Sequence, residues 1–233
     1  MAVDDSYTKV LLHMNGTDAS TTFTDESGKT WTANGNAQID TASYKFATGS
    51  GLFDGGGDYI DTPDNADFNF GSGDFTIDLQ MRRNSSGVIT KFAGQTDSAK
   101  TNSLSSFRMR FSSGNTLDFQ LYSGSSAYQA TSTGTITNDG NFHHIAVVRY
   151  GNTLTQYIDG IADGTVDVTG VTANNSTYKL AIGRNGEDTA NTMNGWIDEF
   201  RISLGIARWI SDFTPPSAEY SPITFIPHVI NII

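Results

Sequence analysis

Alternation of hydrophobic and polar residues is clearest between residues 141 and 168. Gly151-Asn152 and Asp159-Gly160 are two-residue turn signals, because such turns need a positive φ that Gly and Asn adopt readily. Using the first pair as the turn places Ala146 opposite Tyr157. Side chains alternate between the two faces of a strand, so the hairpin is predicted to have a different set of side chains on each face. One face holds Ile145, Val147, Leu154 and Ile158, and the other holds His144, Ala146, Val148, Thr155 and Tyr157.

The same two-residue period recurs in shorter segments along most of the chain. Segment 74–83 alternates throughout, and segments 106–111 and 116–122 predict a hairpin. Segment 88–92 is predicted to pair back on 74–83. Many short strands separated by polar loops predict an all-β fold, a sandwich of two antiparallel sheets.

One segment departs from this period near the C-terminus. Its apolar residues follow the i, i+3, i+4, i+7 spacing of a helix face: Ile206, Trp209, Ile210 and Phe213. The spacing predicts one short C-terminal helix of one to two turns, which ends before Pro215-Pro216.

We expect a folded domain over residues 1–220 and an apolar C-terminal arm over residues 221–233. Pro222 and Pro227 disfavour a helix in the arm. The arm either folds back on its own sandwich or adds as an extended strand to a neighbouring subunit. We favour the second alternative, in a homo-oligomer or multicopy assembly. The predicted partner-binding residues are Ile223, Phe225, Ile226, Val229, Ile230, Ile232 and Ile233.

Charge and composition exclude several function classes. The formal net charge is -11, and no Lys/Arg cluster offers the basic face that nucleic-acid binding requires. No apolar run approaches the ~20 residues of a membrane span, so no membrane insertion is expected. There is no cysteine, which removes disulfides and thiol chemistry. The N-terminus lacks the basic start and apolar run of a signal peptide, so synthesis in a cytoplasm is expected.

Six segments together resemble the laminin-G-like, concanavalin-A-like lectin/glucanase domains. They are GSGLFDGGGDYID (49–61), GDFTID (73–78), FHHIAVVR (142–149), YIDG (157–160), LAIGRN (180–185) and GWIDEFRIS (195–203). The resemblance implies a jelly-roll β-sandwich. The ending GIARWISDFTPPSAEY (205–220) resembles the phage-encoded branch, found in head and tail accessory proteins of bacteriophages.

Lectins, glycanases, adhesive modules and capsid parts all use this sandwich, so function depends on the site. We expect a non-enzymatic virion protein, a capsid decoration or tail-associated component that contacts other virion proteins. The alternative is a carbohydrate-binding adhesin module for host-surface glycans, and a glycanase is a third hypothesis.

The loop 54–61 is a candidate Ca²⁺ site. Its carboxylates, Asp54, Asp58 and Asp61, and its glycine carbonyls are ligands that a hard cation prefers. Similar domains often carry one Ca²⁺ at the sandwich rim. The alternative is a tight turn in which the acidic side chains cap backbone N–H groups.

Catalytic residues are not predicted. A retaining glycosidase needs two carboxyl groups about 5 Å apart, whereas Asp198 and Glu199 are neighbours on a strand and should face opposite ways. Related glucanases carry Glu-x-Asp-x-Glu, a run that this sequence lacks. We therefore predict that the protein is not an enzyme.

The remaining candidates are histidines and aromatic residues. His143 and His144 are also strand neighbours, and together with His13 and His228 we interpret them as structural. Five aromatic residues are candidates either for stacking on sugars or for core packing: Trp31, Tyr122, Tyr128, Tyr150 and Tyr157.

Overall fold

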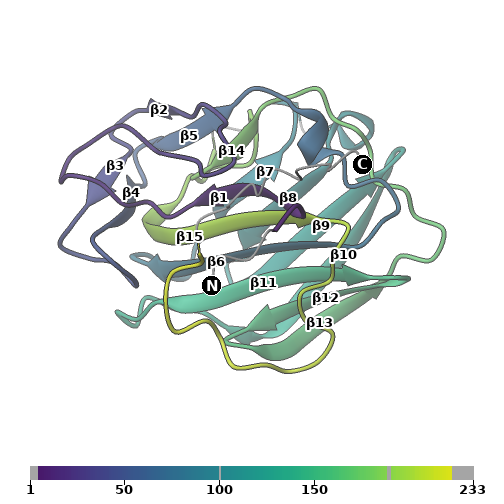
Figure 1. The fold of residues 1–233 in the computed structure, drawn as a ribbon. Helices are drawn as coiled ribbons and strands as arrows, with labels where there is room; N and C mark the ends of the chain where they lie inside the picture. The colour runs from purple at the N-terminus through teal and green to yellow at the C-terminus, as the bar shows by residue number, and fades with distance from the viewer. Residues whose placement is uncertain (1–4, 100, 188–189, 222–233) are drawn as a thin grey trace, which may run out of the picture.

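The computed structural model describes residues 5–99, 101–187 and 190–221, which form two packed antiparallel sheets (Figure 1). The strands are β1 (Thr8–Leu12), β2 (Thr32–Asn34), β3 (Gln38–Asp40), β4 (Ser50–Asp54), β5 (Tyr59–Thr62), β6 (Phe75–Arg83), β7 (Thr90–Gln95), β8 (Phe107–Phe111), β9 (Thr116–Ser123), β10 (Ser126–Thr135), β11 (His143–Tyr150), β12 (Thr153–Ile158), β13 (Ile161–Asp167), β14 (Leu180–Ile182) and β15 (Asn194–Leu204). Two short 3-10 turns, η1 (Ala66–Phe68) and η2 (Asn102–Leu104), are the helical elements of the described residues. Neither is long or apolar enough to cross a membrane.

The strand order confirms the predicted antiparallel sandwich. The 8-stranded sheet runs β13-β12-β11-β6-β15-β4-β3, with β1 also paired to β15, and the 7-stranded sheet runs β10-β9-β8-β7-β14-β5-β2. The predicted register of the β11–β12 hairpin is confirmed, since Ala146 lies opposite Tyr157 and Ile145 opposite Ile158. The hairpin predicted over 106–122 is also present, as β8 and β9.

The predicted pairing of 88–92 with 74–83 is wrong. β6 lies between β11 and β15, whereas β7 lies in the other sheet between β8 and β14. The chain crosses from one sheet to the other after Arg83. The guanidinium of Arg83 donates to Asn115 Oδ1 at 3.1 Å, a contact with the loop between β8 and β9 of the second sheet. Alternation alone does not show whether the next strand continues the same sheet or crosses to the facing one.

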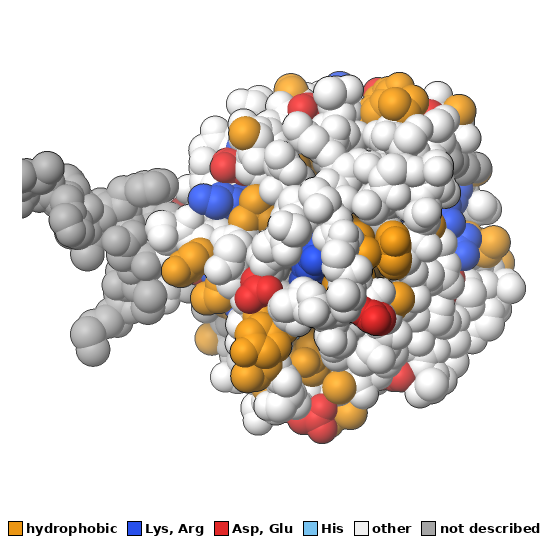
Figure 2. Space-filling view, turned by 90° about the vertical axis from the view of Figure 1, so that its right-hand side faces the viewer, with side chains coloured by type: hydrophobic (Ala, Val, Ile, Leu, Met, Phe, Trp, Pro, Cys, Tyr) orange, Lys and Arg blue, Asp and Glu red, His pale blue; other side chains and the backbone are white. Residues whose placement is uncertain are grey.

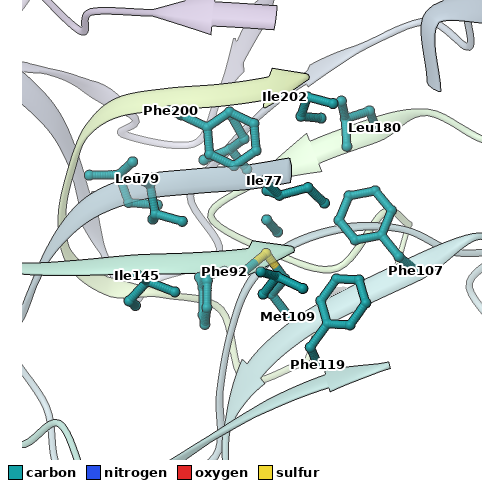
Figure 3. Close-up of a cluster of buried hydrophobic side chains, with 14 of the residues drawn as sticks. Ile77, Leu79, Phe92, Phe107, Met109, Phe119, Ile145, Leu180, Phe200 and Ile202 are labelled. Carbon is teal, nitrogen blue, oxygen red and sulfur yellow. The ribbon is translucent and has the colours of Figure 1, made fainter. Parts of the chain in front are cut away.

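The core between the sheets is rich in phenylalanine. Figure 3 shows inward side chains of both sheets meeting, among them Ile77 and Leu79 of β6 and Phe107 and Phe119 of neighbouring β8 and β9. The rings of Phe107 and Phe119 stack at 6.0 Å. Burying each such side chain stabilises the fold by about 2–3 kcal/mol, and each of these strands has a neighbour on both sides in its sheet.

The surface seen in Figure 2 carries hydrophobic side chains in separate patches, with few charged groups between them. On this side, therefore, the described residues form no single continuous apolar surface.

Residues 205–220, which we call the strap, cover the outer face of the 8-stranded sheet. In Figure 1 its yellow trace leaves β15, passes β12 and β13, and returns toward β15. Ala207, Trp209 and Phe213 of the strap pack on Ala146, Val148 and Tyr157 of the sheet. The sandwich therefore has a second, smaller apolar layer outside its main core.

The predicted helix over 206–213 is wrong, because the strap bonds to the sheet rather than to itself. Phe213 N donates to Gly160 O at 2.8 Å, and Arg208 N donates to Thr76 Oγ1 at 3.0 Å. The spacing that resembled a helix face instead brings Trp209 against Phe213, with ring centroids 4.1 Å apart. Of the predicted arm over residues 221–233, residues 222–233 lie outside the described residues, among them all of its predicted partner-binding residues.

Gly160 tests the docking of the strap. It has φ +80, and a Cβ there would stand 1.9 Å from Phe213 O, whereas Gly151 has φ +56 and nothing within 4 Å of its Cβ position. Gly160→Ala is expected to lower the free energy of unfolding by on the order of 2 kcal/mol more than Gly151→Ala, because both strain the backbone but only the first displaces the strap. Urea unfolding measures this difference, and equal losses would contradict the docked position of the strap.

Candidate functional site

An open groove lies between the β11–β12 hairpin and the strap. Tyr150 pairs with Thr153 and Val148 with Thr155, so these side chains share the outer face of the sheet. Trp209 and Ile210 form the opposite wall. The groove has a volume of about 230 Å³ and is lined by Val148, Tyr150, Thr153, Thr155, Tyr157, Trp209 and Ile210.

The chemistry of this groove is aromatic and uncharged. Tyr150 is 58% exposed at its edge, whereas Tyr157 is buried. Burial raises the pKa of Tyr157, and the charge of Asp212 raises it further, so the phenol stays neutral. Aromatic faces and threonine hydroxyls without a lining charge suit an uncharged ligand that has both apolar faces and hydroxyl groups.

Two of the five predicted aromatic candidates come together here, Tyr150 and Tyr157. Tyr122 is buried on the outer side of the 7-stranded sheet with its hydroxyl on Gln120. Two lie elsewhere in or against the main core, Trp31 and Tyr128. Sequence reasoning missed Trp209, because its spacing to Phe213 fitted a helix face better than a strap.

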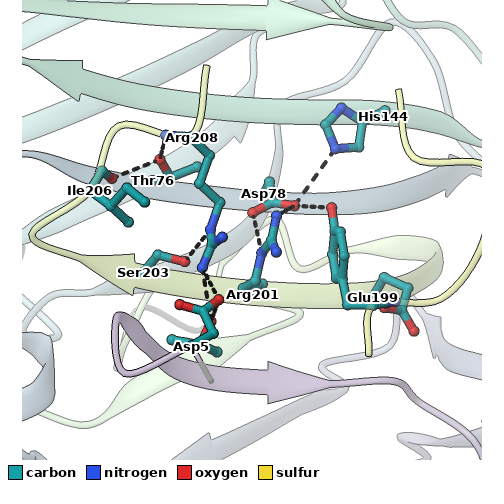
Figure 4. Close-up of polar contacts among 11 residues, drawn as sticks. Asp5, Thr76, Asp78, His144, Glu199, Arg201, Ser203, Ile206 and Arg208 are labelled. Carbon is teal, nitrogen blue, oxygen red and sulfur yellow. Dashed lines mark hydrogen bonds and ion pairs between the residues drawn. The ribbon is translucent and has the colours of Figure 1, made fainter. Parts of the chain in front are cut away.

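A buried polar network supports the strap from below (Figure 4). Arg201 Nε donates to Asp78 Oδ1 at 2.9 Å, and the hydroxyl of Tyr220 donates to Asp78 Oδ2. The Arg201 guanidinium lies 3.6 Å from the centroid of the Tyr220 ring. Burial alone would raise the pKa of Asp78, but the charge of Arg201 and the contact with His144 hold it at about 2. The carboxylate is therefore charged at neutral pH, and Tyr220 closes over the pair.

The histidine neighbours face different surroundings, as predicted for two successive strand residues. His143 is near the surface, with Nδ1 2.7 Å from Asp159 Oδ2 and Nε2 3.1 Å from Asp139 Oδ2. His144 is buried, and its ring is nearly perpendicular to those of Trp209 and Phe213, with ring centroids 5.4 and 5.6 Å away. The pair does not converge on one point.

Asp198 and Glu199 lie at an irregular point of β15, where its register against β6 shifts. Glu199 has φ +52, so the simple alternation that we assumed for these neighbours does not hold. Asp198 Oδ2 accepts from Lys45 N and Phe46 N at 2.8 and 3.0 Å. Glu199 Oε2 accepts from Tyr220 N at 2.9 Å. Both carboxyl groups are buried and engaged in structural contacts, and neither lines the groove.

The structure does not gather the predicted calcium ligands into one cluster. Asp58 accepts from Asn36 N and from Asp54 N, both at 2.7 Å. Asp54 Oδ1 accepts from Gly56 N at 2.6 Å. Asp61 instead faces Lys179 Nζ at 3.2 Å. The capping alternative therefore describes Asp54 and Asp58, and Ca²⁺ binding at this loop stays a prediction.

The three glycines of this loop line a second cavity, at the rim of the sandwich. It has a volume of about 520 Å³ and is bounded by Gly55, Gly56, Gly57, Ser85, Val88, Ile89, Thr90, Asn191, Thr192 and Asn194. No aromatic side chain is among these lining residues, which makes the strap groove the better candidate for a stacked ligand.

Sequence comparison identifies the family. A laminin-G-type family model, described as the Concanavalin A-like lectin/glucanases superfamily, matches residues 54–205. The chain belongs to this family, as the resemblance implied. Among curated protein sequences, no significant match was found.

Solved structures share the fold at low sequence identity. The binding domain of Paraclostridial Mosquitocidal Protein 1 superposes with a TM-score of 0.66 at 16% identity, over 84% of this chain and 48% of that one. Domain 4 of AbnA, an extracellular arabinanase from Geobacillus stearothermophilus, superposes with a TM-score of 0.63 at 19% identity. The match covers 87% of this chain and 95% of that domain. The binding domain of Botulinum Neurotoxin DC superposes with a TM-score of 0.61 at 19% identity. The match covers 86% of this chain and 48% of that one. The chain thus spans about half the length of these toxin binding domains.

Asp198 predicts a pH dependence of stability. Burial raises the pKa of this carboxyl to about 7, and the charge of Glu199 adds to the effect of burial. The native state then holds the proton more tightly than the unfolded chain, so this contribution is present at acid pH and is lost as the pH rises from about 4 to about 7. Asp198→Asn keeps an acceptor for the two amides and removes the buried charge.

Relative to the unchanged protein, Asp198→Asn is expected to gain on the order of 1–4 kcal/mol of unfolding free energy at about pH 8, and little near pH 4. Urea unfolding across this range measures the difference. If the difference in unfolding free energy between the two proteins is the same at every pH, ionisation of Asp198 does not destabilise the folded state.

Proposed function

We propose that this chain is a non-catalytic module that binds uncharged glycans in the groove between the β11–β12 hairpin and the strap. The observation that carries the proposal is the meeting of Tyr150, Tyr157 and Trp209 in one open groove that no charged side chain lines. A sugar ring offers an apolar face for aromatic contact and hydroxyls for Thr153 and Thr155.

Proteins of the same fold support a binding role. Domain 4 of AbnA was solved with arabinotriose, and the binding domain of Botulinum Neurotoxin DC was solved with SialylT. At this level of identity the likeness concerns the fold, so the choice of ligand rests on the groove residues of this chain.

The absence of catalysis is part of the proposal and rests on the carboxyl groups. Asp198 and Glu199 are buried, and their oxygens accept from backbone amides or pair with His13. A glycosidase needs its acid and its nucleophile or base to reach the sugar in a cleft. Release of reducing ends from a polysaccharide, abolished in Glu199→Gln, would overturn this part.

Tyr150→Ala is expected to weaken glycan binding by about 2- to 12-fold, because contact with one aromatic face contributes about 0.5–1.5 kcal/mol. The matched control is Tyr44→Ala, since Tyr44 is 46% exposed and does not line the groove. A glycan array, run with and without EDTA, identifies the ligand, and titration compares the variants. No binding to any neutral glycan, or equal losses in the two variants, would contradict the groove.

That the chain is a component of a phage virion is a separate part of the proposal. The ending 205–220, which resembles the phage-encoded branch, is the strap, and it both closes the sandwich and forms one wall of the groove. A head decoration or tail-associated protein presented in many copies gains avidity from weak single sites. The apolar arm supplies its contact with other virion proteins or with a second copy.

Mass spectrometry of purified phage particles tests this setting. The chain is expected in the particles at several copies, and its removal is expected to reduce attachment to host cells. Its absence from washed particles would overturn the virion setting and leave the groove proposal standing.

A further inference from the structure

Three side chains with metal-binding atoms converge at the end of the strap. His13, Glu199 and Glu219 each place one ligand atom within 4.8 Å of the others. They come from three separate segments: the residue after β1, the irregular point of β15, and the last turn of the strap. Two carboxylates alone are common on an acidic surface. Together with an imidazole nitrogen they form a set of oxygen and nitrogen ligands.

The fold holds these groups in place. β1 pairs with β15 through Leu12 and Phe200, which brings the following His13 beside the preceding Glu199. His13 Nδ1 lies 2.6 Å from Glu199 Oε1. Tyr220 N donates to Glu199 Oε2, which fixes the backbone next to Glu219. The meeting point is thus set by the sheet and by the anchored strap.

The cluster is closed on one side and open on the other. Glu199 is buried, His13 is largely buried, and Glu219 is exposed. Asn15 Nδ2 donates to Glu219 Oε1 and orients this exposed carboxylate. An ion can therefore enter from the solvent side and keep water in its remaining coordination positions, while the surrounding hydrogen bonds orient its ligands.

The charge at this point favours a cation. Two carboxylates face one imidazole, and the charge of Glu26 adds to them. Burial alone would lower the pKa of His13, but the hydrogen bond and charge of Glu199 raise it, together with the charges of Glu219 and Glu26. A proton on His13 is therefore the competitor of any metal ion.

The distances fit one ion after a small adjustment. With bonds of about 2.0–2.1 Å, two tetrahedral ligands of Zn²⁺ lie about 3.3 Å apart. The distance of 2.6 Å between His13 Nδ1 and Glu199 Oε1 must then widen by about 0.7 Å. The imidazole favours a first-row transition ion over Ca²⁺, which prefers oxygen ligands alone.

We propose that His13, Glu199 and Glu219 form a site for a divalent transition-metal ion, which fastens the end of the strap to β1 and β15. The site is independent of the glycan groove and of any predicted Ca²⁺ at loop 54–61. Bound metal stabilises the folded form, because the unfolded chain does not bring the three ligands together.

The test uses the full chain, freed of metal and then titrated with Zn²⁺. Calorimetry is expected to give one Zn²⁺ per chain, and thermal unfolding is expected to shift upward with Zn²⁺ but not with the same concentration of Ca²⁺. The Zn²⁺ shift is expected to be larger at about pH 8 than at about pH 6, because the proton on His13 competes.

Variants assign the site. Glu219→Gln changes an exposed carboxylate, so the fold should be kept while Zn²⁺ affinity falls at least tenfold. His13→Gln should abolish the shift. The matched control is His143→Gln, because the carboxylates around His143 contact opposite ring nitrogens and do not converge on one ion.

The proposal is overturned if Zn²⁺ leaves the unchanged protein unaffected, if Glu219→Gln responds as strongly as the unchanged protein, or if His143→Gln abolishes the response. An equal response to Ca²⁺ would also overturn it, since a site without the imidazole would then account for the binding.

Discussion

The ion pair between Asp78 of β6 and Arg201 of β15 constrains everything on the outer face of the 8-stranded sheet. Both side chains are buried, and an uncompensated buried charge would cost about 3–5 kcal/mol. The part of the strap that covers the pair excludes water from it, so this cover must also provide hydrogen bonds in place of water. Tyr220 supplies that cover, with its ring on Arg201 and its hydroxyl on Asp78. The strap and the ion pair are therefore coupled, because the docked strap buries the two charges and Tyr220 provides a hydrogen bond that this burial requires.

Once the strap lies across this pair, it decides where the two proposed binding sites form. Its aromatic residues pack on the β11–β12 hairpin, and Trp209 becomes a wall of the groove beside Tyr150. Its last turn brings Glu219 to His13 and Glu199. The groove and the cluster of His13, Glu199 and Glu219 therefore both depend on the docked strap.

The family accounts for the sandwich, and the proposed glycan groove rests on residues of this chain. Membership of the concanavalin-A-like superfamily accounts for two antiparallel sheets with a phenylalanine-rich interior. The same sandwich is shared with an arabinanase domain and with toxin binding domains at less than 20% identity. The groove of this chain is lined by residues from outward strand positions and from the strap, and none of them is charged. The irregular backbone at Glu199 likewise makes the middle of β15 a meeting point of side chains.

The sequence by itself determined the all-β class, the β11–β12 register and its two turns, because alternation and turn residues are local properties. It also placed Val148, Thr155 and Tyr157 on one face, which the structure shows to be the outer one. Tertiary structure decided what local pattern does not carry. The crossing from β6 to β7 depends on which sheet offers a partner, and the path of 206–213 depends on the sheet surface that replaces its helical hydrogen bonds. The neighbours of Asp198, Glu199 and Asp61 also come from distant segments, so no spacing along the chain could reveal whether these carboxylates cap amides, pair with cations or converge with a histidine.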